Sequence, residues 1–298
     1  MKIKRLSLKD KKVFRKYLGL AEHELSVFAF ENIYIWKGLF QIEWAIIEDS
    51  LSVFFRDQLG CFLYLAPLGA KKDPVAVEGS FEIMDRFNKN REISRVENVE
   101  EKEVDFYRRA GYQCQVKSYD YLCLGSDLAK LKGNKFKSQR ASYNYFTRHY
   151  AFEYSPFTLK DKGECLKLYD SWTKARQDHN ADRIYQGMLE DSRNSLKNML
   201  DNYADLNLVG RVVRIDKKIR GFTFGFKLNP HTFCILYEIT DLSVKGLAQF
   251  IFRKFSGDLA DYKYINIMDD SGLENLKKVK LSYHPVRLIP AYIAKRQD

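Results

Sequence analysis

Two stretches of the sequence carry many basic residues and no acidic one, and both hold side chains suited to binding a phosphate. The first stretch covers 130–148, where Lys137, Arg140 and Asn144 recur at intervals that place them on one face of a helix. Such a helix can bury its aromatic face and present the basic face to a phosphate-bearing partner. We predict that these three residues bind an anionic substrate group; a solvated basic face is the alternative.

The second basic stretch, 277–296, contains a corner between a helix and a strand, because Pro285 disfavours helical backbone at the residue before it. Such a corner can bind a phosphate or an anionic head group and can supply a proton carrier. We predict substrate binding by Lys280, Ser282 and Arg287, and catalytic roles for Tyr283 and His284. The alternative for the last two residues is capping and packing at the corner.

Two adjacent carboxylates, Asp269 and Asp270, follow a predicted strand over 263–268. Carboxylates at the carboxyl end of a sheet strand are well placed for chemistry in an α/β fold. One of them could orient or deprotonate an attacking amine or hydroxyl group. We therefore predict a catalytic role for Asp269, whereas Asp270 and Ser271 are expected to cap the helix that follows.

The elements that must position these residues follow a similar order in both halves of the chain. In the second half, hydrophobic periodicity predicts strands over 152–158, 208–215, 219–227, 232–239, 263–268 and 286–294, and helices over 162–177, 183–203, 243–260 and 272–280. In the first half it predicts strands over 33–36, 40–48, 51–56, 61–66, 93–98 and 112–124, and helices over 8–18, 74–89 and 100–110.

This order predicts an α/β (α+β) fold of two tandem domains, each a mixed central sheet flanked by helices. The domains are expected over residues 1–127 and 151–298. Residues 128–150 would form a basic and aromatic helix that connects them.

The element order is the one found in acyltransferases of the GNAT superfamily, and two stretches make the likeness more specific. Residues 120–146 are DYLCLGSDLAKLKGNKFKSQRASYNYF, and residues 264–292 are YINIMDDSGLENLKKVKLSYHPVRLIPAY. Both stretches resemble the bacterial family related to the C-terminal domain of phosphatidylglycerol lysyltransferase. The stretch Asn32–Trp36 fits the same family, so the resemblance covers nearly the whole chain.

The resemblance implies a tandem GNAT-like fold and an acyl or aminoacyl transferase. Its characterised members move an aminoacyl group from a charged tRNA to the head group of phosphatidylglycerol. For this chain the implied reaction is transfer from a charged tRNA to an amine or hydroxyl acceptor such as a lipid head group. The sequence departs from the family pattern at Gln139, Ala141 and Ile267–Met268.

Two other interpretations stay open. An acetyl-CoA-dependent N-acetyltransferase acting on a small amine would use Lys245 and Gly246 to hold the cofactor pyrophosphate at the start of the helix 243–260. A catalytically inactive anion-binding module of the same fold is favoured by Ile267–Met268, where the family usually has Arg-Glu. The sequence identifies no cofactor; acetyl-CoA or another acyl-CoA is compatible with it as a cofactor, and aminoacyl-tRNA as a co-substrate.

Composition narrows the class of partner. The 50 Lys and Arg residues exceed the 39 Asp and Glu residues, and the net charge of +11 suits an anionic ligand such as tRNA, CoA or a phospholipid head group. The aromatic content of 14% excludes a disordered chain. Five cysteines without a C-x-x-C pair predict buried thiols in a reducing compartment, and no metal-binding spacing is present.

The N-terminal sequence has no apolar region typical of a signal peptide. No stretch approaches the roughly 18 apolar residues of a membrane span. We therefore expect a cytoplasmic protein without a transmembrane segment, for which peripheral contact with the inner membrane surface stays open. The oligomeric state is not determined by these patterns.

Overall fold

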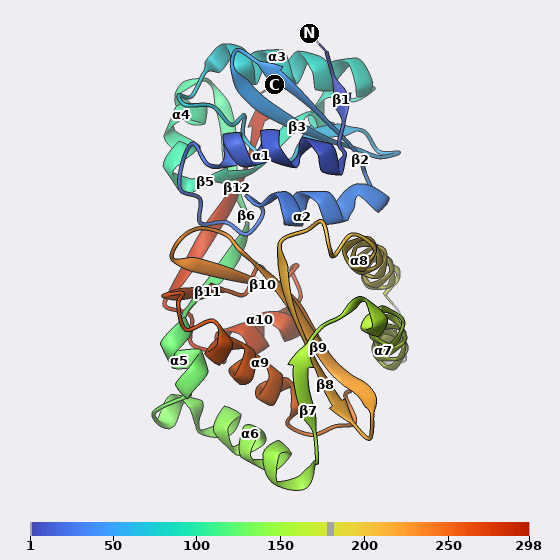
Figure 1. Ribbon diagram of the computed structural model, residues 1–298. Coiled ribbons are helices and arrows are strands. Elements are labelled where there is room, and N and C mark those ends of the chain that lie inside the picture. The colour runs from blue at the N-terminus through green and yellow to red at the C-terminus, as the bar shows by residue number, and fades with distance from the viewer. Residues whose placement is uncertain (1, 178–181, 298) are drawn as a thin grey trace. The chain divides into compact units, whose positions relative to one another are not determined.

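The structure, a computed structural model, describes residues 2–177 and 182–297 (Figure 1). The chain forms two compact units that are not consecutive along the sequence. Unit 1 comprises Met1–Asp120, Asp269–Gly272 and Leu288–Asp298, and unit 2 comprises Tyr121–Met268 and Leu273–Arg287. This division differs from the expected one at 127 and 150, because segments from the second half of the chain belong to unit 1.

Unit 1 is a mixed sheet with helices. Its strands are β1 (Lys4–Arg5), β2 (Gln41–Ile47), β3 (Ser50–Arg56), β4 (Cys61–Leu63), β5 (Arg95–Glu100), β12 (Arg287–Arg296) and the first part of β6 (Tyr112–Leu124), in the order β1-β2-β3-β4-β5-β12-β6. Its helices are α1 (Lys11–Leu18), α2 (Phe30–Ile35), α3 (Pro74–Phe87) and α4 (Val104–Arg109). The pair β4–β5 is parallel, whereas β2, β3 and β4 form an antiparallel run.

Unit 2 repeats this plan. Its strands are β7 (Glu153–Pro156), β8 (Leu208–Ile215), β9 (Lys218–Lys227), β10 (Thr232–Thr240), β11 (Tyr264–Asn266) and the end of β6, in the order β6-β11-β10-β9-β8-β7. Its helices are α5 (Gly125–Lys130), α6 (Lys137–His149), α7 (Lys162–Gln177), α8 (Arg183–Asp201), α9 (Leu247–Asp258) and α10 (Glu274–Leu281). The pair β10–β11 is parallel and the other recorded pairs are antiparallel.

The predicted fold class is confirmed, and most predicted elements lie within a few residues of their expected bounds. The clearest exception is 33–36, which was expected as a strand but lies at the end of α2 and the turn after it. All six residues of α2 are buried, so the helix has no solvent-exposed face to give it an amphipathic pattern. Periodicity alone cannot distinguish a short buried helix from a short buried strand.

One strand is exchanged between the two halves of the chain. The late strand β12 pairs with β5 in unit 1, for example Ala291 with Glu100. The end of β6, from the first half, pairs with β11 in unit 2, for example Leu122 with Asn266. Each sheet is therefore completed by a strand from the other half of the sequence, which explains why the units are discontinuous.

The helix expected to connect two domains, α6, packs inside unit 2. Its aromatic side chains contact α9, with ring centroids 4.6 Å apart for Phe146 and Phe250 and 5.6 Å apart for Tyr143 and Phe250. The predicted burial of an aromatic face is confirmed for Phe146, which is fully buried. Its partner is α9 of the same unit.

Two further expectations can be compared with the described residues. All five cysteines are free thiols, and four of them are buried. No helix within the described ranges combines the length and apolar character needed to cross a bilayer.

Packing between α6 and α9 generates a test at Gly246. This residue has φ +83°, and a Cβ added to it would overlap the carbonyl oxygen of Ser142 on α6. We expect Gly246→Ala to lower the free energy of unfolding by about 2–4 kcal/mol, because it adds overpacking to a left-handed backbone. Urea unfolding measures the loss.

The matched control is Gly257→Ala, in the last turn of the same helix, where a Cβ would meet nothing within 4 Å. This control should keep or slightly raise stability, by up to about 1 kcal/mol. Equal stability of the two variants would contradict the packing at Gly246.

Candidate functional site

The central strands of unit 2 pair over only three positions. Parallel pairing joins Thr232, Phe233 and Cys234 of β10 to Tyr264, Ile265 and Asn266 of β11. Strand β10 continues to Thr240, whereas β11 ends at Asn266. The second half of β10 therefore runs on beyond the pairing with β11, at the carboxyl ends of two parallel strands, where ligands commonly bind in α/β sheets.

A β-bulge between Ile235 and Tyr237 marks the same point on β10. Beyond it, Tyr237 lies opposite Phe224 of β9 and Glu238 lies opposite Thr223. The hydroxyl of Tyr237 donates to the backbone oxygen of Ser192 on α8 at 3.0 Å. The bulge thus commits Tyr237 to α8 and leaves Glu238 on the other side of the sheet.

Glu238 carries a carboxyl oxygen that the protein does not satisfy. Its Oε2 atom is buried and has no hydrogen-bond partner, and the same holds for the hydroxyl of Thr223, its cross-strand neighbour. The residue as a whole keeps some exposure, but burial of the carboxyl raises its pKa to about 8. A buried unsatisfied polar group calls for a functional explanation.

Tyr283, predicted as catalytic, is buried close to this carboxyl. Its ring packs on Phe252 with centroids 4.2 Å apart. Burial, and then the charge of Glu238, raise the pKa of Tyr283 far above its ordinary value. Its hydroxyl therefore stays protonated at neutral pH and can act as a hydrogen-bond donor.

Glu238 is not among the residues predicted from the sequence. The residue lies in the apolar run TFCILYEI, which predicts a buried central strand and little else. The available signal was that Glu238 is the one charged residue of that run. A buried carboxylate is rare unless it is paired or functional.

The corner around Tyr283 joins the two basic stretches. The side-chain amide of Gln139 on α6 donates to the backbone oxygen of Ser282 at 2.7 Å. The Nε2 atom of His284 lies 3.0 Å from the backbone oxygen of Lys135, and its ring meets Phe136 edge-on. The stretches 130–148 and 277–287 therefore contact each other within unit 2.

Other predicted residues of the corner bond to backbone. Lys280 Nζ donates to the carbonyl oxygen of Ile267 at 2.5 Å, just beyond β11. The hydroxyl of Ser282 donates to the oxygen of Val279 at 2.7 Å. Arg287, the last residue of the corner, is exposed. His284 adopts φ +52°, which the sharp turn before Pro285 requires.

On α6 the predicted residues divide into two kinds. Arg140 donates to the carbonyl oxygens of Leu131 and Gly133, so it holds the end of α5. Lys137 and Asn144 are exposed. Among Lys137, Arg140 and Asn144, Lys137 is the residue with an exposed cationic side chain that can bind an anion.

The predicted cofactor residues lie at the start of α9. The ammonium of Lys245 lies over the ring of Tyr145, 4.5 Å from its centroid. The backbone of Ser142 occupies the space beside Gly246. The amide of Leu247 already donates to the oxygen of Val244.

Asp269 belongs to unit 1. Burial, and then the charges of Glu97, Asp269 and Asp120, raise the pKa of Tyr64. Asp269 therefore acts electrostatically on Tyr64. The cap expected from Asp270 is wrong: α10 begins at Glu274 with Leu273 before it, and the Asp270 carboxylate accepts from the Gly272 amide at 3.0 Å.

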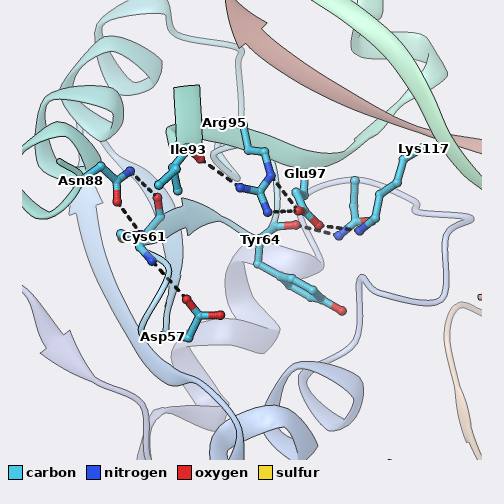
Figure 2. Close-up of polar contacts among 10 residues, drawn as sticks. Asp57, Cys61, Tyr64, Asn88, Ile93, Arg95, Glu97 and Lys117 are labelled. Carbon is cyan, nitrogen blue, oxygen red and sulfur yellow. Dashed lines mark hydrogen bonds and ion pairs between the residues drawn. The ribbon is translucent and has the colours of Figure 1, made fainter. Parts of the chain in front are cut away.

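Unit 1 holds its own polar network around the buried Glu97, next to the single β4–β5 pair, Leu63 with Val96 (Figure 2). Glu97 accepts from Arg95 Nε at 2.9 Å and from Lys117 Nζ at 2.5 Å. Burial alone would raise the pKa of Glu97, but Lys117 and Arg95 hold it below its ordinary value. Asn98 donates to the Tyr64 oxygen at 2.9 Å, so side chains fill the place of further strand pairing.

A change of Glu238 to glutamine tests its protonation. The carboxyl has an ordinary pKa of 4.5, and about 8 in the folded chain, so the folded state binds the extra proton between these values. Wild-type stability should therefore fall as pH rises from about 4.5 to 8. Glu238→Gln removes this loss. Relative to the wild type, its free energy of unfolding should rise by about one to a few kcal/mol between pH 5 and pH 9.

Urea unfolding at pH 5, 7 and 9 provides the measurement. The matched control is Glu22→Gln, which changes an exposed carboxyl of unit 1 and should follow the wild-type profile. Parallel pH profiles for Glu238→Gln and the wild type would contradict a buried, titrating Glu238.

Comparisons with known proteins agree with this fold. A conserved protein of unknown function from Bacteroides thetaiotaomicron VPI-5482 is similar at 28% identity, with a TM-score of 0.87 and 99% of each chain covered. L-PGS from Bacillus licheniformis is similar at 15% identity and a TM-score of 0.68, covering 99% of this chain and 93% of that one. A tandem GNAT protein from the clavulanic acid biosynthesis pathway has 7% identity and a TM-score of 0.51, with 100% and 99% coverage.

A search of curated proteins finds no match. The two similarities below 25% identity show the fold alone, and they agree with the expected tandem GNAT-like architecture. The family model described as "Phosphatidylglycerol lysyltransferase, C-terminal" matches residues 19–295. The match includes the first basic stretch, all but the last residue of the second, and β10, which carries Glu238. The chain therefore belongs to the family of the phosphatidylglycerol lysyltransferase C-terminal domain.

Proposed function

We propose that this protein moves an aminoacyl group from a charged tRNA to an amine or hydroxyl acceptor such as a lipid head group. Family and fold support an acyltransferase of the GNAT-like type related to lysylphosphatidylglycerol synthase. The unsatisfied carboxyl of Glu238, beside Tyr283 and beyond the last β10–β11 pair, is the observation that carries the proposal.

In the proposed reaction, Glu238 accepts the proton of the attacking amine or hydroxyl. The nucleophile bonds to the carbonyl carbon of the aminoacyl ester, and the bond from that carbon to the ribose oxygen breaks. Glu238 then returns a proton to the ribose oxygen, so atoms and charge balance. A pKa of about 8 suits this exchange near neutral pH.

The neutral hydroxyl of Tyr283 is suited to a second task. As negative charge develops on the carbonyl oxygen, a hydrogen-bond donor held in a buried setting stabilises it. Tyr283 stays protonated because of its burial and the nearby Glu238. Direct transfer of this kind depends on positioning and needs no covalent intermediate on the protein.

The joined basic stretches support a phosphate-rich donor. The segment that carries Lys137 contacts the segment that carries Arg287. The contacts are those of Gln139 with Ser282 and of His284 with Lys135. Lysine and arginine on one surface bind nucleic acid through its phosphates. For Asp269, in unit 1, we keep the proposed role of orienting the acceptor. Its charge helps to raise the pKa of Tyr64.

Packing at the start of α9 supports tRNA over acyl-CoA as the donor. A pyrophosphate at a helix N-terminus needs open space and unused backbone amides. Here the backbone of Ser142 lies beside Gly246, and the Leu247 amide already donates to Val244. The predicted cofactor roles of Lys245 and Gly246 thus have less support than the tRNA-binding roles.

Transfer of radiolabelled lysine from lysyl-tRNA to phosphatidylglycerol tests the proposal, with acetyl-CoA plus a small amine as the comparison. Glu238→Gln should lower kcat at least about a hundredfold, within the range of general base catalysis, while KM for the tRNA changes little. Glu22→Gln is the matched control and should be fully active. Unchanged kcat in Glu238→Gln would overturn the role of Glu238.

Donor binding is tested separately with Lys137→Ala combined with Arg287→Ala. Loss of two phosphate contacts should raise KM for the tRNA about tenfold or more and reduce its salt dependence, while kcat stays near the wild type. The control Lys160→Ala removes an exposed lysine elsewhere in unit 2. Equal KM values in the double variant and the control would exclude this surface as the tRNA site.

A further inference from the structure

Helix α10 differs from the other helices of unit 2 for which burial is described, because none of its eight residues is buried. Helix α9, in contrast, buries six residues, among them Phe250, Ile251 and Phe255. Apolar side chains of α10 and of the corner after it face solvent: Val279 is 54% exposed, Leu281 42% and Val286 49%. We refer to residues 274–287 as the α10 surface.

Basic side chains accompany these apolar ones. The α10 surface contains Lys277, Lys278, Lys280 and Arg287 and a single acidic residue, Glu274. Lys277 and Lys278 are both exposed. Lys277 reaches Glu274 at 3.5 Å, but both side chains are largely exposed, so the pair neutralises little of the field. The surface is therefore both apolar and positively charged.

The C-terminal half of the α10 surface, from Lys280 onward, is tied to the rest of unit 2. Lys280 bonds to Ile267, Gln139 bonds to the Ser282 oxygen, and the amide of Val286 donates to the oxygen of Leu122 at 2.8 Å. These bonds tie the segment to β11, α6 and β6. Since the backbone is fixed, the exposed valines and leucine cannot turn inward without breaking them.

We propose that the α10 surface docks unit 2 on a bilayer that contains anionic phospholipid. Exposed apolar side chains enter the boundary between head groups and acyl chains, while nearby lysines reach the phosphates. Charge complementarity selects this occupant over a neutral surface, because the exposed Lys277 and Lys278 lie beside the exposed apolar side chains and 274–287 contains a single acidic residue. The inference deepens the proposed function by naming where a lipid acceptor is met.

Co-sedimentation with vesicles tests the docking without tRNA or turnover. Vesicles of phosphatidylglycerol and phosphatidylcholine in equal parts should bind the protein at least about tenfold more tightly than vesicles of phosphatidylcholine alone. Val279→Asp with Leu281→Asp should reduce binding to the anionic vesicles at least about tenfold. Lys277→Glu with Lys278→Glu should give a similar loss and weaken the dependence on salt.

The matched control is Leu159→Asp, which changes a leucine of unit 2 that is 57% exposed but lies outside the α10 surface. It should bind as the wild type does. Equal losses in Leu159→Asp and the α10 variants would overturn the assignment. So would absence of binding by the wild type together with a dimer in gel filtration that Leu281→Asp dissociates, since the surface would then serve self-association.

Activity separates this inference from the proposed function. Detergent-dispersed phosphatidylglycerol removes the need for docking, so the α10 variants should then transfer at the wild-type rate. Loss of vesicle binding with retained transfer supports docking. Transfer to dispersed lipid by a wild type that binds no vesicles would overturn docking and leave the proposed function in place.

Discussion

Exchange of one strand between the halves of the chain is the constraint on which both sheets depend. β12 pairs with β5 in unit 1, and the end of β6 pairs with β11 in unit 2. Neither sheet reaches its full strand order from its own half of the sequence. The predicted site residues are divided between the units: Asp269 belongs to unit 1, whereas Lys280, Tyr283 and Arg287 belong to unit 2.

Within unit 2, the bulge in β10 decides where the candidate base lies. Phe233 and Ile235 belong to a core cluster that includes Tyr283. With regular alternation, Tyr237 would be the next residue on the face of the sheet that carries Phe233 and Ile235. The register shift between Ile235 and Tyr237 places Glu238 on that face instead. A buried carboxyl costs stability, which the apolar cluster around it offsets. Such a departure from a well-satisfied core is typical of functional positions.

Sequence patterns predicted the local elements well and their assembly less well. The strands 208–215 and 112–124 coincide with β8 and β6, because their length and composition distinguish them from helices. The two basic stretches were recognised from charge alone, and the structure joins them through Gln139 and His284. The discontinuous units could not be foreseen, since pairing between distant strands leaves no local pattern.

The candidate site was predictable in part. Tyr283 stood out because of the corner before Pro285, but Glu238 was hidden in an apolar strand whose bulge has no clear sequence signal. Asp270 was expected to cap a helix, yet α10 starts later and Asp270 closes a turn on Gly272. Arg140 matched a binding pattern but holds the end of α5. For Asp270 and Arg140 a nearby backbone group binds the side chain, and that competition is settled only in the folded chain.

Strand exchange has a consequence for biosynthesis. When residues 1–120 have been synthesised, β5 still presents the edge to which β12 will pair. β12 begins only at Arg287. Such an open edge is a template for pairing with another chain. The sheet of unit 1 therefore stays incomplete during most of translation. Unit 1 can finish folding only after unit 2 has been synthesised. Until β12 has been synthesised, the edge of β5 is open to pairing with another chain.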